Sequence, residues 1–179
     1  PPPISHAARL LRSDIRPAPP ARPDTRLTYA QAPDPRSQPL VKGPDFPALA
    51  RYRAEYQDDG ADDTVIVDSS GAMVETTTGA LVAWEGETIV LPTGTVLPSI
   101  TLHQVTQRAG ALGIRTETRP LTPELATECP LWFLNSLHGI SPVTELHTPG
   151  GVTYPPYNPH ATAWQQWWRD SFHKETGRD

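Results

Sequence analysis

The sequence predicts a mixed α/β fold, and three features support this prediction. Short runs rich in β-branched residues, such as 64–68, end in turn signals and are typical of strands. Segments with apolar residues at helical spacing, such as 99–112, lie between these runs. A proline-rich stretch over the first 47 residues precedes this regular part. A chain of 179 residues with 37% hydrophobic content can bury the core of one domain or slightly more.

The proline-rich stretch is interpreted mostly as a linker, because proline breaks helices and central strands. Two ordered pieces are predicted within it: a helix over 6–12 and a strand over 26–30, where apolar and polar residues alternate. The sequence opens with Pro1-Pro2-Pro3 and lacks an initiator methionine. We therefore expect a fragment, a processed chain or only the ordered part of one.

The regular part begins with a helix predicted over 44–57, where proline suits the first turn. Two hairpins are predicted next. The first joins strands 64–68 and 73–78 through a Ser-Ser-Gly turn, and the second joins strands 80–84 and 88–91 through Glu-Gly-Glu.

A second long helix is predicted to begin near Ser99 and to end before Gly113, which is typical of a helix C-cap. The elements predicted after it are a strand over 114–118, a short helix over 123–127, a buried strand over 131–134, a strand over 143–146 and a helix over 161–173. The last helix carries Trp164, Trp167 and Trp168 on one face. It is most simply a docking helix that packs on the body of the protein or on a partner subunit.

Composition excludes several classes of function. The formal net charge of -5 offers no basic surface for nucleic acid. Cys129 is the only cysteine, so neither an internal disulfide nor a cysteine-based metal cluster is expected, which fits a reducing cytoplasm. No apolar stretch approaches the roughly 20 residues that cross a bilayer, and the start lacks a signal-peptide pattern. We expect a cytoplasmic protein without a nucleic-acid, membrane or metal partner.

Two charged residues stand out chemically. Lys42 follows Leu40-Val41 and precedes Gly43-Pro44, at the edge of a packed element where partial desolvation would lower the pKa of its amine. On its own, such a lysine is usually a solvated surface residue. Glu75 lies in an otherwise neutral strand, so it either faces water or is buried against a cation.

The helix start at Ile100-Thr101 offers free backbone amides and a hydroxyl, as anion sites do. The structural alternative is that Ser99 only caps this helix. These residues alone therefore do not decide between an anion site and a simple helix cap.

Six blocks of sequence follow one another in a specific order: Lys42-Gly43-Pro44-Asp45, 60–71, 74–81, Leu91-Pro92-Thr93, 97–101 and 135–143. In this order they resemble the class IV aminotransferase family, the fold type IV enzymes that use pyridoxal 5'-phosphate (PLP). The resemblance covers about 39–146. Within this family, the sequence is similar to the group that contains branched-chain and D-amino-acid aminotransferases and aminodeoxychorismate lyase.

The resemblance implies a domain organisation. The fold would be the C-terminal domain of a fold type IV enzyme, with a truncated or partly missing N-terminal domain. Residues 1–41 would be the remnant of that domain and a linker, residues 42–146 the PLP-binding domain, and residues 147–179 a C-terminal tail. A homodimer is also implied, with the partner subunit helping to close the site.

The resemblance further implies roles for single residues. Lys42 would form a Schiff base with PLP and move a proton between substrate and cofactor. Glu75 would pair with the pyridine nitrogen. Ile100 and Thr101 would hold the phosphate, with Ser136 beside them.

The loop Asn135-Ser136-Leu137 would also receive the substrate carboxylate through backbone amides, which makes Ser136, Leu137 and His138 the expected substrate contacts. We interpret His138 as a loop residue and not as an acid–base group. Arg9 resembles the family's arginine that reaches the phosphate from a His-x-x-Arg-Leu helix, and the alternative for it is a solvated helix face.

Three positions depart from the family's usual pattern: Thr76 where glycine is common, Ala80 where asparagine is common and Leu102 where a basic residue is usual. They leave the substrate open. The first hypothesis is an aminotransferase acting on an amino acid and a 2-oxo acid. The alternatives are an aminodeoxychorismate-type lyase that releases pyruvate, and an inactive relative that serves as a binding or scaffold module.

Overall fold

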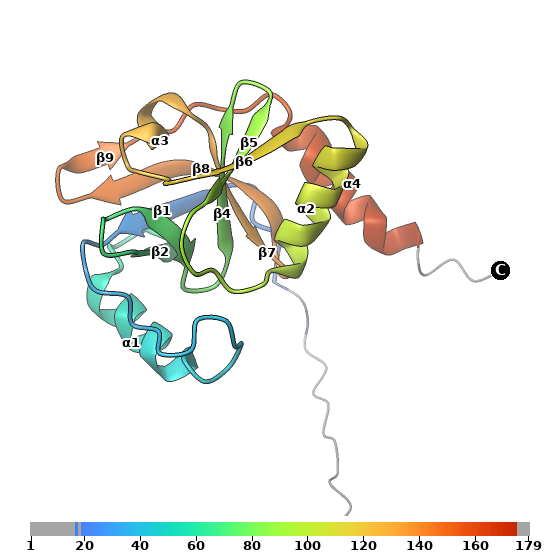
Figure 1. Ribbon diagram of the computed structural model, residues 1–179. Coiled ribbons are helices and arrows are strands. Elements are labelled where there is room, and N and C mark those ends of the chain that lie inside the picture. Colours follow the sequence, from blue (N-terminus) through green and yellow to red (C-terminus); the bar gives the residue numbers. More distant parts are fainter. Residues whose placement is uncertain (1–16, 18, 175–179) are drawn as a thin grey trace, which may run out of the picture.

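The computed structural model describes residues 17 and 19–174, and its strands form one sheet that curves around a central core (Figure 1). The strands of this sheet are β1 (Thr25–Tyr29), β2 (Asp63–Val67), β3 (Met73–Thr76), β4 (Ala80–Glu85), β5 (Thr88–Pro92), β6 (Arg115–Arg119), β7 (Leu131–Asn135), β8 (Gly139–Thr148) and β9 (Gly151–Thr153). The helices are α1 (Phe46–Tyr56), α2 (Ile100–Ala111), α3 (Leu125–Glu128) and α4 (Ala161–Lys174). The fold is therefore mixed α/β, as the sequence predicts.

The sheet order is β3-β2-β1-β8-β7-β4-β5-β6, and β9 pairs with β8. Because β3 also pairs with β4, at Glu75 and Ala80, the strands from β3 round to β4 form a closed ring. β1 runs parallel to both of its neighbours, β2 and β8. The two predicted hairpins, β2–β3 and β4–β5, are confirmed as antiparallel pairs.

Successive side chains of each strand point to opposite faces, so the ring has an inner and an outer apolar cluster. The inner cluster includes Leu27, Val65 and Phe133, all with no exposed surface. The outer face carries a second cluster, to which α2 contributes Val105 and α4 contributes Trp164. The ring is thus packed inside and covered by helices on part of its outside.

Helices α2 and α4 lie next to each other on that outer face (Figure 1). The indole Nε1 of Trp168 donates to Gln104 of α2 at 3.2 Å. The sequence leaves two partners open for the tryptophan face, the body of the protein or a partner subunit, and in the structure this face packs on the body. Helix α1 packs elsewhere, with Tyr52 against Ile66 of β2.

Several boundaries differ from the sequence prediction. Strand β8 begins at Gly139 and not at residue 143, because a tight turn joins it directly to β7. Strand β9 was not predicted. Strand β1 belongs to the same ring as β2 although it precedes residue 42, while the helix predicted over 6–12 lies outside the described residues. No helix in residues 19–174 combines the length and apolarity that a membrane crossing requires.

Candidate functional site

Glu75 of β3 is a buried carboxylate with a cation as its partner. The residue as a whole is only 7% exposed, and Arg36 Nη1 donates to its Oε1. The backbone amide of Leu97 donates to its Oε2 at 3.0 Å. Burial raises the pKa of Glu75, and the Leu97 amide and the charge of Arg36 act in the opposite direction. Of the two sequence alternatives, burial against a cation is the one that the structure shows.

Arg36 reaches Glu75 from the proline-rich stretch between β1 and α1. Its Nε donates to Oδ1 of Asp34 at 2.9 Å and its Nη2 to Oδ2 of Asp34 at 2.7 Å, which is a forked ion pair. Its Nη2 also donates to the Thr95 carbonyl at 3.0 Å. Burial lowers the pKa of Arg36, but the bonds and charges of Asp34 and Glu75 outweigh that effect and leave the pKa raised. The guanidinium is therefore a fixed cation in this site.

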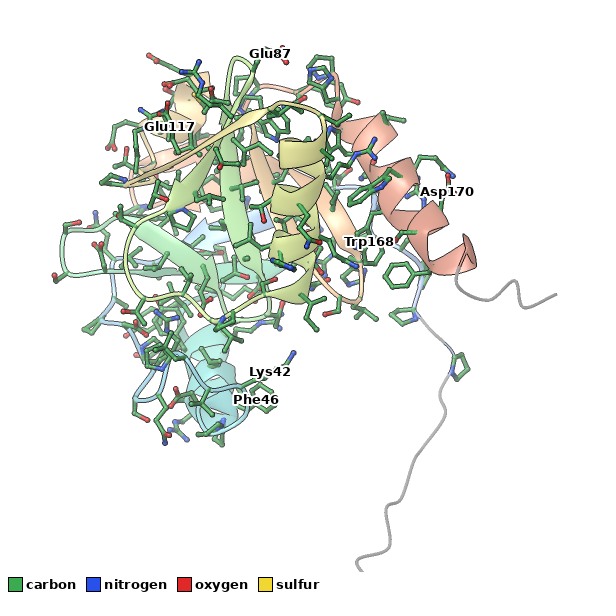
Figure 2. All side chains as sticks on the ribbon, turned by 45° about the vertical axis from the view of Figure 1, so that its right-hand side comes forward. Lys42, Phe46, Glu87, Glu117, Trp168 and Asp170 are labelled. Atoms are coloured by element: carbon green, nitrogen blue, oxygen red, sulfur yellow. The ribbon has the colours of Figure 1, made fainter. Side chains whose placement is uncertain are left out.

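Lys42 lies in the turn that leads into α1, and Asp45 holds this turn together. One oxygen of Asp45 accepts from the backbone amide and hydroxyl of Ser37, and the other accepts from the Gln38 amide at 2.8 Å. Figure 2 shows the Lys42 side chain extending away from the ribbon near the start of α1. Of the two alternatives for Lys42, partial desolvation or a solvated surface position, the structure shows the solvated one: Lys42 is exposed, and Val41 beside it is 51% exposed.

The start of α2 combines a side-chain cap with backbone amides of the first helical turn. The Ser99 hydroxyl accepts from the Leu102 amide at 3.2 Å, so Ser99 is the helix cap. The amides of Ile100 and Thr101 lie in the first turn, where a helix has no carbonyl to offer them. Thr101 is buried and Ile100 is 73% exposed. The cap and the anion site are therefore compatible, because the cap uses a different amide.

In the turn between β7 and β8, two of the amides expected to be free for a ligand already have an acceptor. The amides of Leu137 and His138 donate to Oδ1 of Asn135, at 3.1 Å and 2.8 Å, so they are engaged within the turn. The exposed Ser136 keeps its place at the tip. Nδ1 of His138 accepts from the Arg22 amide at 3.3 Å, and burial lowers the pKa of His138. The carboxylate contact expected from this loop stays a prediction, and in the structure the amides of Leu137 and His138 already have an acceptor.

Two hydrogen bonds tie Glu75 to segments that continue into other predicted parts. Arg36, which donates to Glu75, directly precedes Ser37, whose amide and hydroxyl donate to Asp45 in the turn of Lys42. Leu97, whose amide donates to Glu75, lies shortly before Ile100, where α2 begins. Within the described residues, no hydrogen bond ties Ser136 to these groups, and Arg9 lies outside them. Sequence reasoning missed Arg36, since an arginine in a proline-rich stretch carries no local signal of burial.

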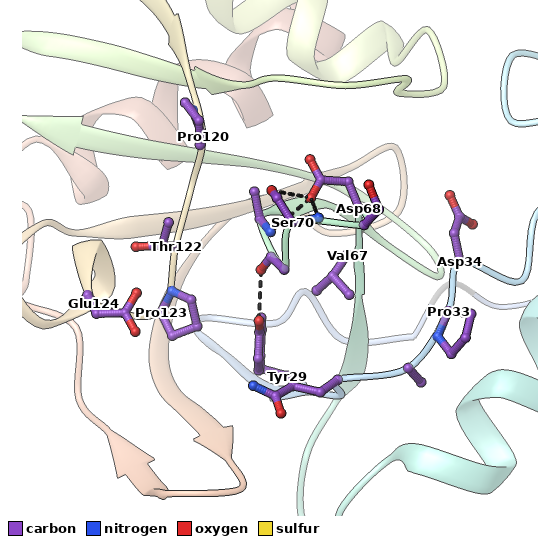
Figure 3. A pocket seen from close by; sticks show the side chains of 15 residues that line it. Tyr29, Pro33, Asp34, Val67, Asp68, Ser70, Pro120, Thr122, Pro123 and Glu124 are labelled. Carbon is purple, nitrogen blue, oxygen red and sulfur yellow. Dashed lines mark hydrogen bonds between the residues drawn. The ribbon is translucent and has the colours of Figure 1, made fainter.

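A separate pocket of about 800 Å³ opens between the end of β1, the β2–β3 turn and the segment before α3 (Figure 3). None of the predicted site residues that the structure describes lines it. Its acidic residues are Asp34, Asp68 and Glu124, and among the described residues its lining contains no lysine or arginine, which makes it unsuited to a phosphate. Several of its polar groups serve the turn itself: Tyr29 donates to the Gly71 carbonyl at 2.7 Å, and Asp68 accepts from Ser70.

Comparison with known proteins places this geometry in context. Residues 5–146 match the family model for amino-transferase class IV. The fold is similar to a branched-chain aminotransferase from Thermoproteus uzoniensis solved with norvaline, with a TM-score of 0.73 and 17% identity over 86% of this chain and 53% of that chain. No curated protein matches the sequence.

Two further solved structures show the same likeness. An aminotransferase from Brucella abortus bound to the co-factor PLP has a TM-score of 0.72 and 18% identity, over 89% of this chain and 58% of that chain. The 4-amino-4-deoxychorismate lyase from Pseudomonas aeruginosa has a TM-score of 0.69 and 22% identity, over 93% and 62%. At these identities the likeness concerns the fold, and the chain spans little more than half the length of the aminotransferases.

Proposed function

Because the chain belongs to the class IV aminotransferase family, we propose that it binds PLP through Lys42 and transfers an amino group between an amino acid and a 2-oxo acid. The observation that carries this proposal is that the buried Glu75 is hydrogen-bonded to Arg36, in the segment that leads to Lys42, and to Leu97, in the segment that leads into α2. An amine, a buried carboxylate and free helix amides are the groups that PLP requires. In this chain they come from separate elements and are linked through Arg36 and Leu97.

The residues present fit the cofactor chemically. When bound, PLP supplies a carbonyl for amine chemistry and a pyridine ring that withdraws electrons while its nitrogen is protonated. Ile100 and Thr101 would hold the phosphate through their amides, since the positive end of a helix favours an anion. Glu75 would carry the negative charge that keeps a ring nitrogen protonated.

Lys42 would bind the cofactor covalently at Nζ and afterwards hold a proton there for transfer to the substrate carbon. Its exposure supports this role, since both cofactor and substrate must reach the amine. Ser136, at the exposed tip of the β7–β8 turn, would contact the phosphate or the substrate carboxylate.

The test uses the small number of lysines in this chain. Lys42 and Lys174 are the only two lysines in the sequence, so a covalent PLP adduct has two possible side chains. Purified chain is incubated with PLP, scanned in the visible range, reduced with borohydride and mapped by mass spectrometry. We expect an absorbance band and a phosphopyridoxyl group on the peptide of Lys42.

Lys42→Ala and Lys174→Ala are the matched pair. Lys42→Ala is expected to abolish the band and the trapped adduct, and Lys174→Ala to leave both in place. Equal labelling of the two peptides, or a band that survives Lys42→Ala, would refute the assignment. A folded chain that traps no PLP would favour the inactive scaffold hypothesis.

The lyase alternative is supported by the likeness to the Pseudomonas aeruginosa lyase, which covers 93% of this chain. The two reactions differ in their need for an acceptor. A transaminase requires a 2-oxo acid to complete each cycle, whereas an aminodeoxychorismate-type lyase releases pyruvate from one substrate. Pyruvate formation without any added 2-oxo acid would therefore favour the lyase.

A homodimer is part of the same proposal. Apolar side chains beside Lys42 are largely exposed, with Leu40 at 62% and Phe46 at 55%, and a second copy would cover them. Light scattering coupled to size-exclusion chromatography would give the mass of a dimer. A monomer at micromolar concentration would contradict this part.

A further inference from the structure

Arg36 is the residue at the site to which the sequence assigned no role. Together with the Leu97 amide it occupies one acceptor position on each Glu75 oxygen. An ionised carboxylate offers about four such positions, so further donors can still bind. The two contacts also fix the plane of the carboxylate, because each holds a different oxygen.

The charges around Glu75 do not cancel. Asp34 and Glu75 each carry a negative charge and Arg36 carries the positive charge between them. The forked pair with Asp34 uses most of the guanidinium, which leaves a single Nη1 contact for Glu75. Arg36 and Glu75 are both nearly buried, with side-chain exposures of 4% and 9%. The cluster therefore retains one unbalanced negative charge, placed mainly on Glu75, that a cation could neutralise.

We propose that Arg36 is a positioning residue that orients Glu75 and keeps it ionised, so that Glu75 can bind the protonated pyridine nitrogen of PLP. This inference rests on the proposed function, because it takes the cofactor ring as the partner of Glu75. Asp34 is the second residue that sets the charge of Glu75. By sharing the positive charge of Arg36, it leaves Glu75 negative enough to attract a ring cation.

Three substitutions separate these effects. Arg36→Met removes the charge, after which burial favours the neutral acid form of Glu75. Arg36→Lys keeps the charge and loses the forked geometry. Asp34→Asn leaves Arg36 free to pair more fully with Glu75, which reduces the charge available to the ring.

The experiment compares PLP with its 1-deaza analogue, in which a carbon atom replaces the ring nitrogen. Equilibrium dialysis gives the affinity of each variant for both compounds, and the ratio isolates the contact with the nitrogen from all other contacts. We expect the wild-type chain to prefer PLP by roughly tenfold or more, the range of a hydrogen bond to a charged group. Arg36→Met should lose most of this preference.

Arg36→Lys should keep most of the preference. Asp34→Asn should lower it measurably but by no more than about fivefold, since Asp34 is 32% exposed. Glu75→Gln should lose the preference, and adding Arg36→Met to it should cause no further loss. Arg119→Met is the control, because Arg119 of β6 forms an exposed ion pair with Glu85 of β4 and none with Glu75 or Asp34.

An Arg36→Met chain whose affinity for both compounds falls by the same factor, so that the preference for PLP stays at the wild-type value, would show a merely structural role and overturn the proposal. If Arg36→Met does not fold, an unchanged ratio in Asp34→Asn overturns the proposal and a lowered one supports it. A wild-type chain that traps PLP on Lys42 but shows no preference would overturn this inference alone, whereas absence of trapping would overturn the proposed function.

Discussion

Replacing Asp63 with asparagine tests how the backbone next to Glu75 is held. Asp63 has no exposed surface, and five donors converge on its two oxygens. Oδ1 accepts from the Thr64 amide at 2.8 Å and from the Thr77 hydroxyl. Oδ2 accepts from the Thr78 amide at 3.1 Å and from the hydroxyls of Thr76 and Thr78. The carboxylate thus holds the turn that follows Glu75.

The size of the stability loss depends on which of the five donors can still form a hydrogen bond with an asparagine. Asparagine has the same size, so Asp63→Asn creates no cavity. The threonine hydroxyls can rotate and accept a bond instead. The amides of Thr64 and Thr78 cannot, and because they face different oxygens, either orientation of the asparagine leaves one of them facing an NH₂ group.

An unsatisfied buried donor costs about 1–3 kcal/mol, and the remaining bonds lose their charge assistance. We therefore expect Asp63→Asn to lower the free energy of unfolding by about 2–4 kcal/mol. Urea unfolding followed by tryptophan fluorescence at pH 7 measures this difference.

Asp68→Asn is the matched control. Asp68 also accepts three bonds in a turn, but all three, from the Ser70 amide, the Ser70 hydroxyl and the Ala72 amide, go to Oδ1. An asparagine keeps that oxygen, so the expected loss is below about 1 kcal/mol. Equal losses in the two variants, or a loss below about 1 kcal/mol for Asp63→Asn, would refute the reasoning.

Two further predictions concern packing. Burial raises the pKa of Tyr52 to about 12, so the neutral phenol stabilises the fold fully below its ordinary value of 10.0, and this stabilisation is lost as the pH rises through about 12. Ultraviolet titration of wild type against Tyr52→Phe should show one missing ionisation near 12, and a missing step near 10 would contradict the burial. Gly139→Ala would bring a Cβ within 2.2 Å of the Trp168 ring at a φ of 73°, whereas Gly86→Ala, with a φ of 55°, meets nothing within 4 Å. We expect Gly139→Ala to cost about 1–3 kcal/mol more than Gly86→Ala in urea unfolding, and equal costs would contradict the contact.

Local patterns in the sequence were sufficient for most elements. The cap at Ser99 and the end of α2 before Gly113 were predicted from residue types, and the structure shows the Ser99 bond and a φ of 71° at Gly113. Both features depend on neighbours within one helical turn, where residue preferences are strong. The hairpins were predictable for the same reason.

Long-range contacts were not predictable in this way. The alternatives for Glu75, water or a cation, could not be decided, because its partner Arg36 lies 39 residues earlier and meets it only when β3 closes the ring. The surroundings of Lys42 were likewise left open, because Leu40 and Val41 resemble the end of a packed element but find nothing to pack against in the described residues. Periodicity reports which face of an element is apolar and not what lies opposite.

Glu75 is held in two chemically separate ways, and this separation can be tested. Asp63 fixes the backbone immediately after Glu75 through residues 76–78, whereas Arg36 and Leu97 fix its side chain. Loosening the backbone should displace the carboxylate without changing its charge, so Asp63→Asn should lower the preference for PLP over its 1-deaza analogue only in part. Arg36→Met should lower this preference further, because the charge opposite the nitrogen is lost. If both variants lower the preference by the same factor, the orientation and the charge of Glu75 are not independent, and a single rigid unit extends from Asp63 to Arg36.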